Sequence, residues 1–296
     1  MSEPHIRKVS PDELEEVWRV HVASSNDGAV RRGGQAARPA DSPVASDARA
    51  GLASDPDGYF CAVEEGQIRG MVSALVRGRM WYLSMFFVLP GDQGRGVGRA
   101  LLERALAYGE SRGTEIRFTL ATIDPRAQAR YVMAGMAPRW PIYGLTGDAA
   151  AVTRLAARAG LDPRRRELSC DSATAEKLTA EVFEHDRAID LAHCQRDGGT
   201  AVAVERGGEI AAFAYRRGQK IGPAAARDET ALLQAVAAAA TSGEGNVTIR
   251  VPGACASLLE ALVSCGFQIG GTPTLFMASR LFGRLELYVP SGPILF

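Results

Sequence analysis

Three glycines at alternate positions lie where a strand-like segment passes into a helix-like one, and this arrangement is suited to binding an anion. The run Val88-Leu89-Pro90-Gly91-Asp92-Gln93-Gly94-Arg95-Gly96-Val97-Gly98-Arg99 follows an apolar stretch, Met80–Leu89, that predicts a buried strand. Glycine has no Cβ atom to keep an anion away from backbone N–H groups. The start of a helix adds unpaired N–H donors and about half a positive charge. With the guanidinium groups of Arg95 and Arg99 nearby, the segment predicts a diphosphate site; the alternative is a glycine-rich turn without a ligand.

Two common nucleotide-binding motifs do not fit this loop. A P-loop requires Gly-x-x-x-x-Gly-Lys, but the candidate that begins at Gly91 has Val97 in place of the lysine. A Rossmann fingerprint that begins at Gly94 requires a glycine where Arg99 stands. It also requires a parallel βαβ unit, whereas the strands before this loop are expected to be antiparallel. The diphosphate is therefore expected to belong to another class of cofactor.

The loop and a later helix together resemble one family. Val88-x-Pro90 with the following Gln93–Gly98 resembles the cofactor motif Gln/Arg-x-x-Gly-x-Gly/Ala of the GCN5-related N-acetyltransferases, the GNAT superfamily. Ala127-x-x-x-Tyr131-x-x-x-Gly135-Met136 resembles a helix that follows in the same family. The resemblance covers about residues 5–145 and implies acetyl-CoA as co-substrate. It implies that the backbone of Phe87 and Val88 pairs with the pantetheine arm where two strands separate. It also implies that the pyrophosphate is held by Gln93, Gly94, Arg95, Gly96, Val97, Gly98 and Arg99.

The resemblance also supplies a candidate for the acid but none for the base. Tyr131 is the candidate general acid, because the family has a tyrosine there, near the sulfur; the alternative is a tyrosine that only packs one helix face. Many relatives carry a glutamate on the central strand, but here that strand offers only Tyr82 and Ser84 as polar side chains. Asp124 stands where the family often has asparagine, and the cap of a helix with Pro125 at its first position is the favoured interpretation.

The sequence contains an internal repeat that predicts two domains. Ala62-Val63-Glu64 opens a hairpin, and so does Ala203-Val204-Glu205. Tyr131–Met136 aligns with Leu262–Phe267, each with a glycine at the end of a helix. We therefore expect an α+β fold of two tandem GNAT-like domains, each with a mixed, mostly antiparallel sheet flanked by helices. The catalytic domain is expected at residues 1–160 and a degenerate one at residues 167–296, with a linker near Gly160–Arg166.

The second copy is expected to have lost its cofactor site. Lys220–Asp228 is interpreted as the counterpart of the glycine loop, although it lacks the series of glycines, and Leu262 stands where Tyr131 stood. Asp186-Arg187 is expected to be a structural or surface ion pair rather than part of a cleft.

Elsewhere in the first half, residues 24–58 are predicted to be a loop with short helical turns. Its carboxylates are interpreted either as solvated groups or as an acidic rim for a cationic amine: Asp27, Asp41, Asp47, Asp55 and Asp57.

Composition narrows the class of protein. Basic and acidic residues balance at 34 each, which gives no net field for nucleic acid or an anionic membrane. Five scattered cysteines and four histidines form no CxxC or HExxH pattern, so neither a disulfide framework nor a metal site is expected. No apolar stretch approaches the roughly 20 residues of a membrane span. We expect a cytoplasmic N-acetyltransferase, monomeric or homodimeric, that acts on a small-molecule primary amine. A non-catalytic acyl-CoA sensor is the alternative.

Overall fold

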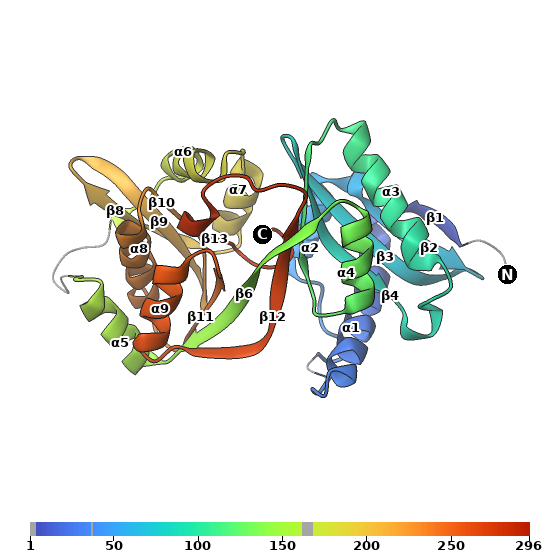
Figure 1. Ribbon diagram of the computed structural model, residues 1–296, viewed down its shortest axis with the longest axis horizontal. Coiled ribbons are helices and arrows are strands. Elements are labelled where there is room, and N and C mark those ends of the chain that lie inside the picture. The colour runs from blue at the N-terminus through green and yellow to red at the C-terminus, as the bar shows by residue number, and fades with distance from the viewer. Residues whose placement is uncertain (1–3, 37, 162–167) are drawn as a thin grey trace. The chain divides into compact units, whose positions relative to one another are not determined.

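The computed structural model describes residues 4–36, 38–161 and 168–296 (Figure 1). Contacts along the chain separate two units. The first consists of residues 1–120 and 124–136, and the second consists mainly of residues 137–294, with the short segment 121–123 grouped with it. The expected linker lies largely outside the described residues.

The first unit is built on a five-stranded mixed sheet. Its strands follow the order of the sequence: β1 (His5–Lys8), β2 (Tyr59–Glu64), β3 (Gln67–Arg77), β4 (Met80–Val88) and β5 (Ile116–Ala121). The first four strands pair antiparallel, and β5 pairs parallel to β4. A parallel pair needs a crossover connection, and α3 (Val97–Ser111) provides it. This crossover places the start of α3 at the end of β4, next to the glycine loop.

The helices of the first unit cover the sheet with apolar stripes. Besides α3 they are α1 (Leu14–Arg31), α2 (Ser46–Ser54) and α4 (Pro125–Met133). One face of α3 is buried and includes Val97, Leu101, Ala105 and Tyr108. Consecutive residues of a strand point to opposite faces of the sheet. Phe86 of β4 contacts the α3 side, where a Cβ on Gly98 would lie 3.3 Å from its ring. The Phe87 ring lies 4.5 Å from that of His21 on α1, so α1 and α3 cover opposite faces.

The prediction of a loop over residues 24–58 is wrong in two places. Helix α1 continues to Arg31 and α2 forms a further helix. Tertiary contacts outweigh the low helix propensity of these segments. Ser24 is buried on α1 and its hydroxyl donates to the Val88 carbonyl at 3.0 Å. In α2, Ala48 and Leu52 are buried.

Four of the five carboxylates of this region are buried or paired, which argues against an acidic rim. Asp55 is buried and accepts hydrogen bonds from the Arg77 guanidinium at 2.6 Å and the Tyr108 hydroxyl at 2.9 Å. Asp27 pairs with Arg31, Asp57 pairs with Lys8, and Asp47 is buried. Most of these acids therefore stabilise the fold locally instead of facing a substrate.

The second unit repeats the first and adds strands. Its strands are β6 (Ala137–Gly147), β7 (Leu168–Ser169), β8 (Thr200–Arg206), β9 (Glu209–Arg217), β10 (Lys220–Ala226), β11 (Val247–Pro252), β12 (Gln268–Ala278) and β13 (Tyr288–Val289). Its helices are α5 (Ala149–Arg158), α6 (Ser172–Phe183), α7 (Ala188–Arg196), α8 (Glu229–Thr241) and α9 (Ala256–Ser264). Within the unit the sheet order is β12-β6-β11-β10-β9-β8-β7, and β13 pairs with β10.

The predicted repeat agrees with the strand pairing. Strands β7 to β11 reproduce β1 to β5, with three antiparallel pairs followed by one parallel pair. The two glycine-terminated helices end alike. Met136 donates its N–H to the Tyr131 carbonyl at 2.9 Å, and Phe267 donates to Leu262 at 3.0 Å. The α+β architecture of two tandem mixed sheets is thus the one that the sequence predicts.

Strand β6 departs from the expected division at residue 160. It lies within the expected first domain, residues 1–160, but it pairs antiparallel with β11 on one edge and with β12 on the other. Leu145 of β6 is buried in the core of the second unit, together with Leu155 of α5. Contacts therefore divide the chain after Met136.

Two features bear on the expectations from composition. All five cysteines are buried and free. None of the helices in the described part of the chain combines the length and the apolar character that a membrane crossing needs.

Candidate functional site

The glycine loop delivers an uncapped helix start at the end of β4. After Val88 the chain makes a short 3₁₀ turn over Pro90–Asp92, and α3 then begins with Gly96 as its N-cap. Gly96 has φ +90°, a conformation that glycine adopts without the steric cost that other residues incur. No side chain accepts from the first N–H groups of α3 at this cap. These donors, together with the helix dipole, form a site for an anion.

Strands β4 and β5 separate just before this loop. Their pairing runs from Met80 and Ile116 to Leu83 and Thr119 and ends there. The Thr119 hydroxyl donates to the Leu83 carbonyl at 2.9 Å. The β3–β4 register shifts at the same level, which leaves Ser84 as the extra residue of a bulge. A bulge bends its strand, so the last residues of β4 diverge from β5 and leave this edge without pairing to β5.

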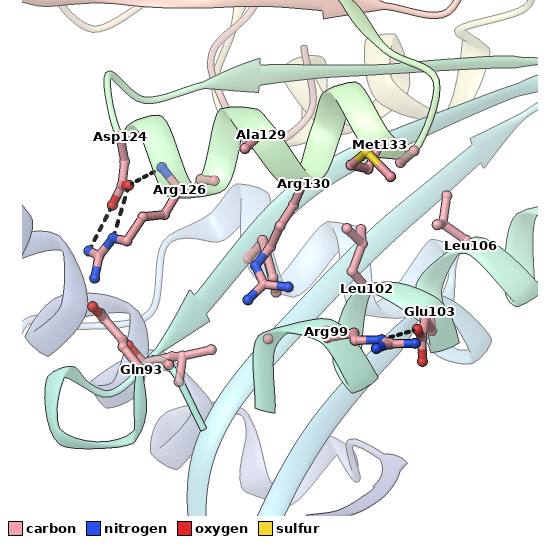
Figure 2. A pocket seen from close by; sticks show the side chains of 16 residues that line it. Gln93, Arg99, Leu102, Glu103, Leu106, Asp124, Arg126, Ala129, Arg130 and Met133 are labelled. Carbon is pink, nitrogen blue, oxygen red and sulfur yellow. Dashed lines mark hydrogen bonds and ion pairs between the residues drawn. The ribbon is translucent and has the colours of Figure 1, made fainter. Parts of the chain in front are cut away.

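One cavity of about 870 Å³ joins these features. It lies between α3 and α4, beside the end of β4 and the glycine loop (Figure 2). It is lined by Phe86, Val88, Gln93, Gly94, Gly98, Arg99, Leu102, Glu103, Leu106, Asp124, Arg126, Ala127, Ala129, Arg130, Met133 and Ala134. An apolar trough with charged groups toward its rim suits a ligand with an apolar arm and an anionic end.

Three arginines line the cavity, and two of them are paired with carboxylates. Arg99 donates to Glu103 at 2.7 Å, and Arg126 pairs with Asp124 at 3.2 Å (Figure 2). Asp124 also accepts from the Arg126 N–H at 2.9 Å, so it caps α4 as the favoured interpretation predicted. Burial raises the pKa of Asp124, but these hydrogen bonds from Arg126 outweigh it and hold the pKa below its usual value. Arg130 is the third arginine that lines the cavity.

The structure brings part of the predicted cofactor set to the cavity. Five of the predicted residues line it: Val88, Gln93, Gly94, Gly98 and Arg99. The Gln93 amide donates to the Val88 carbonyl at 3.1 Å and so braces the loop against the strand. Gly96 occupies the N-cap position and is exposed, and Val97, the first residue of the helix, is buried.

Phe87 and Arg95 lie differently from the cavity-lining residues. The Phe87 ring faces His21, on the opposite side of the sheet, so only its backbone is available to the separated edge. The Arg95 guanidinium pairs with Asp92 at 2.6 Å and with Glu64 at 2.9 Å. Arg95 therefore has two carboxylate partners within the protein, and its contact with a pyrophosphate stays a prediction.

Tyr131 is buried behind the cavity wall. Its ring centroid lies 6.3 Å from that of Phe86, which lines the cavity. Burial raises the pKa of Tyr131, and the nearby Asp124 carboxylate raises it further. The phenol is consequently protonated throughout the neutral range, as a proton donor must be before it acts.

Sequence reasoning missed two features of this site. The first is the pair Arg126 and Arg130, which are spaced i, i+4 on a predicted helix and so share one face; that spacing was available as a signal. The second is His21 of α1, on the opposite face of the sheet from the cavity. It lies beside Phe87, its Nδ1 is 3.3 Å from the Ser25 hydroxyl, and burial lowers its pKa to about 4, with help from Arg38.

Neither polar side chain of the central strand is an evident base. The Tyr82 ring is buried and stacks on Phe118 at 4.7 Å. Ser84 is half-buried at the bulge.

The corresponding region of the second unit is filled by its own chain. Strands β10 and β11 pair only at Lys220–Thr248 and Ile221–Ile249. Beyond this point β13 pairs antiparallel with β10, with Tyr288 opposite Ala225. A Cβ on Gly222 would lie 2.4 Å from the Pro290 carbonyl oxygen, so this segment lies directly against β10.

The loop into the second crossover helix also differs from the expectation. Lys220–Ala226 was aligned with the glycine loop, but it forms strand β10, so the true counterpart of the loop is only Arg227-Asp228. The Asp228 carboxylate accepts from the Ala231 N–H at 2.8 Å and caps α8. Arg187 is buried and pairs with Asp190 at 2.6 Å. This buried pair is structural.

Comparison with known proteins finds a family model that matches part of the chain. Residues 14–136 match the model of the acetyltransferase (GNAT) family. A search of curated proteins gives no match. Among solved structures, a putative acetyltransferase from Pyrococcus horikoshii is similar with a TM-score of 0.79 at 16% identity, over 99% of this chain and 96% of that one.

Two further structures are similar over nearly their full length. A GCN5-related N-acetyltransferase from Sphaerobacter thermophilus has a TM-score of 0.59 at 12% identity, over 96% of this chain and 98% of that one. A tandem GNAT protein from the clavulanic acid biosynthesis pathway also has 0.59, at 14% identity, over 93% and 98%. At such identities these likenesses carry the fold. The family match shows a GNAT acetyltransferase domain over residues 14–136, and acetyl transfer is the general activity of that family.

Proposed function

We propose that the first unit is an acetyl-CoA-dependent N-acetyltransferase that moves the acetyl group onto a primary amine of a small molecule. The observation that carries this proposal is the meeting, at one cavity, of the separated β4 edge and the uncapped start of α3. The unpaired edge offers backbone groups to an amide-containing arm such as pantetheine. The helix start offers N–H donors to a pyrophosphate. Gln93, Gly94, Gly98 and Arg99 would hold the anionic end, and Val88 would contribute backbone contacts to the arm.

Acetyl transfer by direct attack makes two demands on the protein. The acceptor must be a neutral amine, and an amine of pKa about 10.4 is only about 0.1% neutral near pH 7.4, which costs about 4 kcal/mol. Positioning the amine against the thioester offsets part of this cost. As the C–N bond forms and the C–S bond breaks, the nitrogen releases a proton to water and the departing sulfur takes one up, which leaves an amide and free coenzyme A. Tyr131 is the proposed donor, since it is protonated at neutral pH and lies next to a ring that lines the cavity.

We also propose that the second unit binds no coenzyme A. Its β10 edge is paired with β13, and its crossover helix is capped by Asp228. Both features of the first unit that favour a cofactor are therefore missing. This proposal keeps the predicted roles of the two halves, catalytic first and degenerate second, while moving the division of the chain from residue 160 to Met136.

Calorimetric titration of the full chain with acetyl-CoA tests both proposals. One site per chain is expected, and Gly96→Glu should abolish it because the added carboxylate lies at the anion site. Gly96→Ala is the matched control, since it carries the same backbone strain at φ +90° without the charge. Two sites per chain would contradict the degenerate second unit, and no binding would refute the cofactor assignment.

A second assay distinguishes the enzyme from the rival function, a non-catalytic acyl-CoA sensor. Incubation with acetyl-CoA and a panel of small amines should release free thiol at a rate that depends on the amine. Binding without amine-dependent thiol release would favour the sensor.

A further inference from the structure

Arg130 is the one cavity-lining arginine that has no partner in the described part of the chain. Arg99 and Arg126 are held by Glu103 and Asp124, whereas Arg130 forms no ion pair or side-chain hydrogen bond with any described residue. Its side chain is half-buried. Figure 2 shows the guanidinium extending from α4 into the space between α4 and the first turn of α3.

The charges around the cavity leave a single net cation. The three arginines face two carboxylates, and each carboxylate is already engaged with one arginine, so the uncompensated charge is that of Arg130. A half-buried cation loses hydration without gaining a counter-charge, which an anionic ligand would restore. Its planar fork of N–H donors matches phosphate oxygens and can bind two of them at once.

We propose that Arg130 binds a phosphate of the nucleotide end of coenzyme A and so contributes to recognition of the cofactor from the α4 side of the cavity. This inference rests on the proposed function. The backbone donors of the glycine loop and the α3 start lie on the opposite wall, so the anion would be held from two sides. Two phosphates of the cofactor have the required chemistry, the pyrophosphate and the phosphate on the ribose, and titration with two ligands distinguishes them.

The test compares the wild-type chain with Arg130→Gln in titrations with coenzyme A and with its analogue that lacks the ribose phosphate. Arg130→Gln should weaken coenzyme A binding about tenfold, which corresponds to about 1.4 kcal/mol. Arg130→Lys keeps the positive charge but not the planar fork of donors, so its affinity for coenzyme A should lie between those of the wild type and Arg130→Gln. Arg104→Gln is the matched control: it removes an equal charge from α3 outside the cavity, where Arg104 lies over the Phe60 ring, and should leave binding unchanged.

Each outcome has a defined meaning. A loss confined to coenzyme A assigns Arg130 to the ribose phosphate, and an equal loss for both ligands assigns it to the pyrophosphate; both support the proposal. Unchanged affinity of Arg130→Gln for both ligands, with wild-type binding intact, overturns this inference alone. Failure of the wild type to bind either ligand refutes the proposed function and the inference with it. The melting temperature of Arg130→Gln should match that of the wild type, which separates a lost phosphate contact from a lost fold.

Discussion

The proposed chemistry of Tyr131 depends on a single hydroxyl group. Burial raises the pKa of this phenol, so it is protonated at the pH where the thiolate departs. Tyr131→Phe keeps the ring that packs beside Phe86 and removes only the proton. General acid catalysis is worth about 10²–10⁴-fold. We therefore expect kcat to fall at least about 100-fold while the KM for acetyl-CoA changes little. Full turnover with unchanged affinity would assign Tyr131 to packing alone.

His21 gives the stability of the protein a pH dependence of known sign. Burial lowers its pKa from 6.5 to about 4, with a smaller contribution from Arg38. Between these values the unfolded chain binds a proton that the folded chain excludes. Stability contributed by neutral His21 is therefore complete above pH 6.5 and is lost as the pH falls toward 4. The full loss is about 3 kcal/mol, since one pKa unit is worth about 1.36 kcal/mol.

Urea unfolding of the wild type and of His21→Leu at pH 7, 5.5 and 4.5 measures this effect. Leucine fills the site between Trp18 and Phe87 without titrating. The difference in unfolding free energy between the two proteins should shift in favour of the variant as the pH falls. A difference that stays constant across this range would mean that His21 is not held neutral by the fold.

At the scale of the element, Asp124 has two possible roles: it caps α4, or its carboxylate takes part in the reaction in the cavity. It accepts the Arg126 N–H at the start of α4. Asparagine caps helices as well as aspartate does, and alanine does not. We expect Asp124→Asn to keep both stability and turnover, and Asp124→Ala to lose about 1 kcal/mol of stability, as is typical for a lost cap.

A cap in the second unit supplies the control for that pair of variants. Asp148 caps α5 by accepting the Ala151 N–H at 2.8 Å. Asp148→Ala should cost a similar amount of stability and leave acetyl-CoA affinity unchanged. If Asp124→Asn instead loses turnover more than tenfold, the carboxylate itself takes part in the reaction.

The elements also indicate which features a sequence can predict. The β4–loop–α3 segment was predicted closely because its signals are local: an apolar run, a proline and glycines that permit φ near +90°. The extension of α1 to Arg31 depends on contacts with β4, such as that of Ser24, which lie far along the chain. The role of Lys220–Ala226 as a strand also depends on distant partners, since β13 comes some 60 residues later in the sequence. In the site, the i, i+4 spacing of Arg126 and Arg130 was a local signal, and so was the i, i+3 spacing of Asp92 and Arg95. The pairing of Arg95 with Glu64 instead depends on a strand far along the chain.

At the scale of the whole molecule, β6 decides where the chain divides. The repeat favoured a boundary at residue 160, because hydrophobic periodicity identifies a strand but does not say which sheet it joins. In the structure β6 lies between β11 and β12 and pairs along both edges. Removing it would leave two unpaired strand edges and would open the core around Leu145.

Two C-terminal fragments test this division directly. Residues 137–296 retain β6 and α5, and we expect this fragment to unfold cooperatively in urea with a dispersed amide NMR spectrum. Residues 161–296 lack both elements, including the buried Ala151 and Leu155 of α5, and we expect this fragment to aggregate or to remain unfolded. Cooperative unfolding of the shorter fragment would place the boundary near residue 160 and would make β6 an accessory strand. The longer fragment should also bind no acetyl-CoA, because the β10 edge is already paired with β13.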